Sequence, residues 1–122
     1  MRRGEPIFQK VLPNEVPVTL SIEKVFTKDA SDDVFHLECR ICSGEFTGDM
    51  ISLWFYRKRK DGGERQDTRK LLQALVPGKD PAEIKSWMIH GKIFETTPWK
   101  PEASRYQMYG LFRLVGENEY KS

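Results

Sequence analysis

One stretch of the sequence places aromatic rings directly against positive charge. Residues 51–63 read ISLWFYRKRKDGG, in which Trp54 and Tyr56 precede four consecutive cations. These cations are Arg57, Lys58, Arg59 and Lys60. Aromatic rings stack on nucleic-acid bases and basic side chains neutralise phosphates, so the stretch is typical of a single-strand binding surface. A buried strand that ends in a solvated hairpin tip is the alternative interpretation.

The positive charge is clustered, although the whole chain is close to neutral. Residues 57–70 hold seven basic and three acidic residues, a net charge of +4, whereas the whole chain carries +2 and the remainder therefore −2. Such clustering, more than the total, indicates an electrostatic binding surface. An ordinary charged loop with intervening acids would show the same composition.

The residue types that support catalysis or metal binding are sparse. Cys39 and Cys42 have the spacing of half a zinc site, but the chain has no second such pair and its histidines are His36 and His90. His36 and Glu38 match part of the zinc deaminase pattern, but the cysteine motif that should follow is missing. We therefore expect no enzyme activity, no metal and no cofactor, and we interpret both cysteines as structural.

Length and composition favour one small globular domain. The chain has 122 residues, of which 31% are charged and 39% are apolar. It has no apolar run as long as a membrane span, and its first residues lack the apolar core of a signal peptide. Two cysteines are too few for a secreted disulfide framework. The sequence therefore predicts a cytoplasmic protein with no membrane contact.

Alternation of apolar and polar residues predicts five strands, and one segment changes to helical spacing. The predicted strands cover residues 17–27, 34–42, 45–57, 87–97 and 105–115. The helix is predicted over 66–76, with a further helical turn near 80–83. The predicted organisation is an N-terminal extension (1–16), a barrel domain (17–115) and a C-terminal tail (116–122).

This order of elements predicts the fold. The sequence is mainly β, with one helix between the third and fourth of five strands, which is the order of the OB-fold, a five-stranded Greek-key barrel. The match covers residues 17–115 at the level of element order and rests on no residue motif. SH3-like barrels and α+β sandwiches also combine strands with one helix.

The strands divide into an inner and an outer face, because a small barrel fills its interior with every second side chain. Seven residues are predicted to point inward: Phe35, Leu37, Cys39, Ile41, Ile51, Leu53 and Phe55. Four aromatic or basic residues that could contact nucleic acid are predicted on the outer face: His36, Arg40, Trp54 and Tyr56. OB-folds bind oligonucleotides on this face of the second and third strands.

A second aromatic residue is predicted beside this face. Trp99 lies between two prolines in the loop before the fifth strand, and Lys92 and Lys100 are close to it in sequence. That loop often completes the binding groove of an OB-fold. The alternative is that Trp99 folds back over the end of the barrel.

In this plan the chain resembles the small OB-fold single-stranded DNA-binding proteins of bacteria, phages and mobile elements. The resemblance implies non-catalytic, sequence-tolerant binding of single-stranded DNA in replication or recombination. Binding of RNA differs only in the substrate. The chain departs from the familiar bacterial type because it has no long glycine-rich tail with an acidic tip, which leaves partner recruitment open.

A different class of function fits the same aromatic residues. Exterior aromatics on a sheet are often covered by a terminal segment, a helix or another subunit. Four residues near the N-terminus are apolar enough to provide such a cover: Ile7, Phe8, Val11 and Leu12. The alternative prediction is therefore a protein-interaction or assembly subunit, in which the outer aromatics form an oligomer or partner interface.

Overall fold

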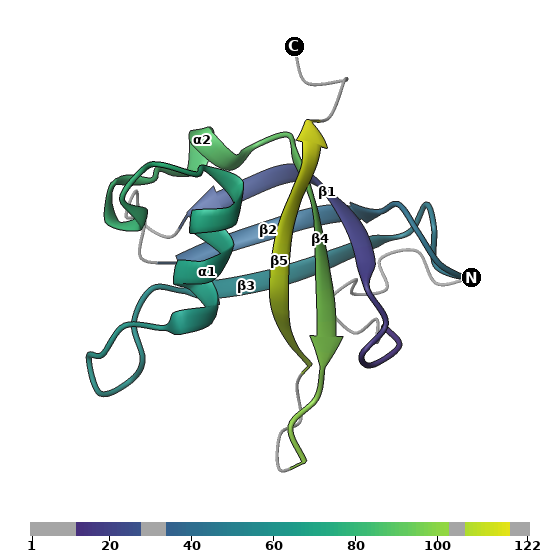
Figure 1. Cartoon of the computed structure of the whole chain (residues 1–122), viewed down its shortest axis with the longest axis horizontal. Helices are drawn as coiled ribbons and strands as arrows, with labels where there is room; N and C mark the ends of the chain where they lie inside the picture. The colour runs from purple at the N-terminus through teal and green to yellow at the C-terminus, as the bar shows by residue number, and fades with distance from the viewer. Residues whose placement is uncertain (1–11, 28–33, 103–106, 118–122) are drawn as a thin grey trace.

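A computed structural model describes residues 12–27, 34–102 and 107–117 of the chain. These residues form one antiparallel sheet in the order β3-β2-β1-β4-β5, so the chain is mainly β as predicted. The strands are β1 (Val18–Thr27), β2 (Val34–Ile41), β3 (Met50–Tyr56), β4 (Lys92–Trp99) and β5 (Met108–Glu117). The sheet is curled, and in Figure 1 the β4–β5 pair crosses steeply over the β1–β2–β3 strands.

The curled sheet is a half-barrel and not the closed barrel that the sequence predicts. Among the described residues, β3 and β5 are its two edges and are not hydrogen-bonded to each other. The edges approach through side chains instead, because the Phe55 ring of β3 meets the Phe112 ring of β5 edge-on with 5.9 Å between centroids. Helix α1 (Gln66–Leu75) packs against β5 on this side (Figure 1).

The core confirms the predicted inner face of β2 and β3. The seven residues predicted to point inward are all at most 2% exposed. Their register explains this burial, because Phe35 lies opposite Phe55 and Leu37 opposite Leu53 on the same face of the sheet. Leu12, within the predicted N-terminal extension, also lies in this core at 2% exposure. Ile7, Phe8 and Val11, proposed above as a cover, lie outside the described residues.

The helical segment contains one short helix that the sequence does not predict. After α1 the chain forms a 3-10 turn, η3 (Pro81–Glu83), where a helical turn is predicted, and then a second short helix, α2 (Ser86–Ile89). The Asp80 carboxylate accepts a hydrogen bond from the Ala82 backbone N–H (3.0 Å) and so begins η3. The prediction of a strand from residue 87 was wrong, because four of its residues lie in or beside α2 and β4 begins at Lys92.

The beginning of the third strand was also predicted wrongly. Residues 43–48 form bends and turns rather than strand. The turn is closed by a hydrogen bond from the Gly48 N–H to the Ile41 carbonyl (2.7 Å), and Gly48 has a φ of 96° that favours glycine. Phe46, within this turn, packs against the core.

One irregularity in β1 decides which of its side chains point outward. The pairing with β2 shifts between Ile22 and Lys24, so Glu23 is an extra residue in β1. Before this bulge Leu20 and Ile22 are buried, and after it Val25 packs against the core while Phe26 is 46% exposed. The bulge therefore places Phe26 on the outer face of the sheet.

Candidate nucleic-acid interface

Three aromatic rings form a row across the outer face of neighbouring strands. Phe26 of β1 lies opposite His36 of β2, and His36 lies opposite Trp54 of β3. The His36 and Trp54 rings are stacked, with 3.8 Å between centroids and 9° between planes. The Phe26 and His36 rings are 5.3 Å apart and tilted by 38°. We call Phe26, His36 and Trp54 the aromatic row.

Trp54 is the end of this row at the edge of the sheet. The imidazole of His36 covers one face of the indole, and β3 has no further strand beside it among the described residues. Trp54 is 48% exposed, which is a large fraction for a tryptophan in a strand. The indole therefore presents a ring face beyond the sheet edge, in line with the stack.

His36 is held in the middle of the row as a neutral ring. Burial lowers the pKa of His36 below its ordinary value, and the negative charge of Glu38 opposes this shift. Its Nε2 is buried and, within the part of the chain that the structure describes, has no hydrogen-bond partner. A charged imidazolium at this position would lose hydration without gaining an acceptor at Nε2, so the neutral form is favoured.

Arg40 belongs to the same outer face but lies four residues along β2 from the aromatic row. It is exposed, and its Nε is 3.7 Å from a carboxylate oxygen of Glu23, the bulge residue of β1. Glu23 also accepts a hydrogen bond from the hydroxyl of Ser21 (3.0 Å). Part of the Arg40 charge is thus compensated, and the residue lies beside the aromatic row rather than in it.

Tyr56 continues the outer face of β3 toward the basic hairpin. It is 45% exposed, and it lies opposite Val34 at the end of the β2–β3 ladder. Its backbone carbonyl accepts a hydrogen bond from the hydroxyl of Thr68 in α1 (2.6 Å). This bond fixes the point at which the strand ends and the hairpin begins.

Arg57, the first cation of the hairpin, has a structural role that its sequence context does not indicate. It donates hydrogen bonds to the carbonyls of Pro81 (2.8 Å) and Ile84 (2.6 Å). Its guanidinium also lies over the ring of buried Phe35, 4.9 Å from the centroid. Arg57 therefore ties the end of β3 to the segment around η3, and it lies on the opposite side of β3 from Trp54.

The other three cations of the run lie on the exposed hairpin. Arg59 pairs with Asp61 (3.2 Å), and its backbone N–H bonds to the Gly63 carbonyl (2.6 Å) across the turn. Lys58 and Lys60 are exposed, and no described residue pairs with either ammonium group. These two lysines are the cations of the run with the greatest freedom to contact phosphates.

The residues predicted around Trp99 are not brought together with the aromatic row. Val18 at the start of β1 pairs with β4 near Trp99, whereas Phe26 near the end of β1 belongs to the row. Trp99 is 44% exposed and lies close to Gly110, and Lys100 beside it is exposed. These residues lie toward the opposite end of the sheet from Trp54.

Lys92 is not near Trp99 either, although both belong to β4. It stands at the first position of that strand and Trp99 at the last. Its ammonium group pairs with the Glu117 carboxylate at 2.7 Å, which compensates its charge. The sequence could not show this pair, because Lys92 and Glu117 become neighbours only in the β4–β5 ladder.

Sequence reasoning missed four residues that lie near the predicted ones. Phe26 was missed because an unbroken alternation through β1 does not anticipate the bulge at Glu23. Three further cations gather near the hairpin: Arg65, Arg69 and Lys85. The first two belong to the charge cluster seen in the sequence, whereas only the fold brings Lys85 close to them.

The two cysteines lie in different environments. Cys39 is buried in β2, and Cys42, just after that strand, is exposed. Burial raises the pKa of the Cys39 thiol, and partial desolvation of the sulfur raises that of Cys42, although the Cys42 residue is largely exposed. Among the described residues, no group of three or more His, Cys, Asp or Glu side chains gathers closely enough to hold a metal ion.

Comparisons with known proteins found no match to any protein-family model, curated protein or solved structure. In the described ranges, no helix combines the length and the apolar composition needed to cross a membrane.

Proposed function

We propose that this protein binds single-stranded nucleic acid, with DNA as the substrate, in replication or recombination. The observation that carries the proposal is the stacked pair of His36 and Trp54, because it holds an indole at the sheet edge with about half of its surface exposed. A base placed on the outer face of this indole extends an existing stack. No base edge needs to be read, so the binding tolerates any sequence.

The stack also lowers the entropic cost of binding. A tryptophan that already lies flat against a histidine has fewer rotamers to lose when a base packs on it. Stacking on such an aromatic contributes about 1–3 kcal/mol per base. Lys58 and Lys60 on the hairpin that follows Tyr56 supply the phosphate contacts, and these make the affinity depend on salt.

The fold adds support of a weaker kind. The order β3-β2-β1-β4-β5 puts β2 and β3 side by side with an outer face rich in aromatic residues. OB-folds use the corresponding face for oligonucleotides, and we propose that the half-barrel is an open variant of that fold. On this interpretation the chain is non-catalytic and acts by covering the strand.

The test is a fluorescence titration in which Trp54 is the reporter. The chain has three tryptophans, so the variant Trp87→Phe/Trp99→Phe leaves Trp54 as the single indole. Oligomers of dT and rU are titrated at two salt concentrations, and dT is expected to quench the emission and to bind more tightly. Tighter binding of rU would change the substrate to RNA, and absence of quenching with both oligomers would contradict the proposal.

A second function is favoured by a separate observation. Leu111 is 79% exposed and Val115 is 49% exposed, both on the edge strand β5. Exposed aliphatic side chains on an edge strand are typical of protein interfaces, including those of homo-oligomers. The second candidate is therefore an assembly subunit, which sedimentation over a range of protein concentrations would detect as association. Trp54→Ala would then weaken association if the aromatic row belonged to the same interface.

A further inference from the structure

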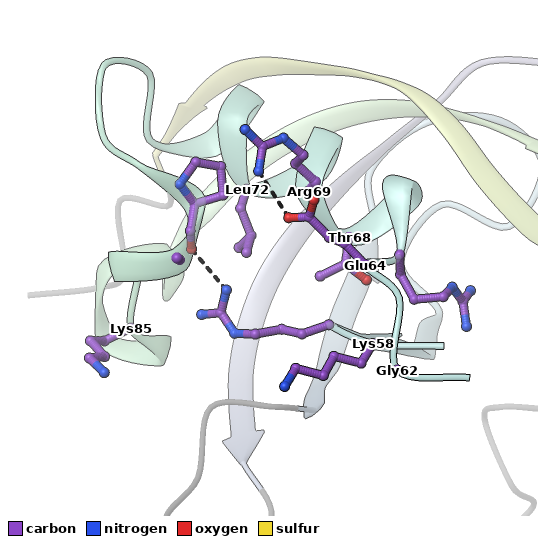
Figure 2. A pocket seen from close by; sticks show the side chains of 11 residues that line it. Lys58, Gly62, Glu64, Thr68, Arg69, Leu72 and Lys85 are labelled. Atoms are coloured by element: carbon purple, nitrogen blue, oxygen red, sulfur yellow. Dashed lines mark hydrogen bonds and ion pairs between the residues drawn. The ribbon is translucent and has the colours of Figure 1, made fainter. Parts of the chain in front are cut away.

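A groove of about 440 Å³ opens where the hairpin, α1 and the segment around η3 meet. Figure 2 shows Lys58 and Gly62 on the hairpin side, Arg69 and Leu72 on the side of α1, and Lys85 on the third side. A volume of this size is typical of pockets that bind small molecules.

The groove is strongly cationic. Five basic side chains line it, together with the single carboxylate of Glu64. The five are Arg57, Lys58, Arg65, Arg69 and Lys85. They come from three separate segments of the chain, and ion pairs with Asp67 and Glu64 offset the charges of Arg65 and Arg69. A hollow lined by charge of one sign attracts ligands of the opposite sign more strongly than a flat surface does.

Two of the guanidinium groups are already held in position. Arg65 is paired with Asp67 at 2.8 Å and Arg69 with Glu64 at 2.9 Å. Each guanidinium carries five N–H donors in a fixed plane, so one carboxylate orients it without using every donor. Planar donors of this kind match the oxygens of a phosphate group, and Lys58 adds a compact positive charge beside them.

The groove is distinct from the aromatic row. Arg57, in its wall, lies over the ring of Phe35 on the core side of β3, whereas Trp54 and Tyr56 face outward. The two features therefore flank the end of β3 on opposite sides. Thr68, which lines the groove, donates a hydrogen bond from its hydroxyl to the carbonyl of Tyr56 at the end of β3.

We propose that this groove is a binding site for a phosphate group, either the terminal phosphate of a nucleic-acid strand or the phosphates of a free nucleotide. A terminal phosphate or a pyrophosphate carries about two or more negative charges near neutral pH, which complements the positive charge that remains in the lining after the two ion pairs. The site needs neither Trp54 nor a single strand, so the inference goes beyond the function proposed above.

The experiment has two arms that separate the two sources of phosphate. In the first, pyrophosphate and thymidine diphosphate are titrated into the full chain by calorimetry. In the second, dT oligomers with a 5′-phosphate, a 3′-phosphate or only hydroxyl ends are compared. Charged hydrogen bonds of this kind should strengthen binding by roughly tenfold or more in at least one arm. The reference is the groove variant described below in the first arm and the hydroxyl-ended oligomer in the second.

A matched pair of variants assigns the effect to the groove. Lys58→Gln/Arg69→Gln removes one hairpin cation and one α1 cation from the lining, and Lys70→Gln/Lys79→Gln removes the same number of charges from exposed residues outside it. The first variant should abolish the phosphate effect and the second should keep it. Circular dichroism and thermal melting confirm that both variants are folded.

The outcomes separate this proposal from the proposed function. Binding of pyrophosphate by Trp54→Ala at the parent affinity would support a separate site, whatever happens to oligonucleotide binding. Binding of pyrophosphate or thymidine diphosphate, without tighter binding of phosphate-ended oligomers, identifies free nucleotides as the source. Tighter binding of a phosphate-ended oligomer than of the hydroxyl-ended one, without binding in the first arm, identifies strand ends. No increase in either arm, or an equal decrease in the two matched variants, would overturn the phosphate site.

Discussion

The imidazole of His36 and the indole of Trp54 lie parallel, 3.8 Å apart, on neighbouring strands of the same sheet face. Because β3 is an edge of the sheet, the stack ends with an exposed tryptophan. This relationship makes Trp54 and its neighbour in sequence, Phe55, opposite in role: one faces outward and the other is buried at 1% exposure.

Replacement of these two neighbours should therefore have opposite effects. Phe55→Ala removes a core ring that contacts Phe112 and should lower the free energy of unfolding by about 3–5 kcal/mol. Trp54→Ala should leave stability almost unchanged and weaken binding of dT oligomers by about 1–3 kcal/mol. Urea unfolding and oligonucleotide titration measure the two effects. A Trp54→Ala protein that is less stable than the parent but binds dT oligomers with the parent affinity would contradict the stacking role.

The stability of the fold should depend on pH through His36. Burial holds the folded-state pKa of His36 below its ordinary value of about 6.5, so protonation favours the unfolded chain. This contribution to stability is complete above the unfolded pKa and is lost as pH falls from about 6.5 toward the lower folded pKa. Urea unfolding between pH 5 and 8, at roughly half-unit steps, should show the decrease in the parent.

The control for this pH dependence is His36→Phe, which keeps an aromatic ring between Phe26 and Trp54 but cannot be protonated. Its stability should fall less than that of the parent over the same interval. Equal pH dependence in the two proteins would show that another group, and not His36, is responsible.

The cations of the hairpin should separate into structural and binding residues. Arg57→Met keeps the apolar stem but leaves the Pro81 and Ile84 carbonyls without their donor, and it should cost about 1.5–3 kcal/mol of stability. Lys58→Gln/Lys60→Gln should leave stability unchanged and reduce the slope of log affinity against log salt by about 0.7 for each phosphate that the variant no longer neutralises.

Salt titrations of dT binding measure that slope. All four cations of the run were predicted from the sequence to contact phosphate, and the geometry of Arg57 changes that expectation for the first of them. A double variant with an unchanged slope would favour the assembly-subunit interpretation.

The two cysteines should differ in reactivity. Cys42 is exposed and should react with an aromatic disulfide reagent in the native protein, whereas Cys39 is buried in β2 and should react only after unfolding. The thiolate released by the reagent, measured with and without denaturant, gives the number of reactive cysteines in the unfolded and in the native protein. Metal analysis of the purified protein should find no stoichiometric zinc, and zinc that disappears on mutation of either cysteine would contradict the structural role.

The sequence predicted the β2–β3 layer well because its alternation is unbroken there. Phe35, Leu37, Leu53 and Phe55 each follow the period of two, and the register across the strands preserves it. Trp54 was found for the same reason. Alternation predicts which side chains are exposed, but it does not predict what those side chains bind.

The errors occurred where a contact distant in sequence overrides a local pattern. The bulge at Glu23 changes which β1 residues point outward, so Phe26 was missed. The composition of residues 87–90 is β-like, yet they form or adjoin α2, and the following Gly91 donates its N–H to the Ile22 carbonyl. Arg57 was counted as a surface cation because its acceptors, Pro81 and Ile84, lie more than twenty residues away.

The open seam between β3 and β5 has a consequence for how this architecture can vary. In a closed barrel the circumference is fixed by the number of strands and their stagger, and it changes only if backbone hydrogen bonds are remade. Here Phe55, Phe112 and the leucines of α1 fill the seam instead. Its width is thus set by side-chain volume, so single substitutions can adjust the curvature of the outer face while every ladder of the sheet stays intact.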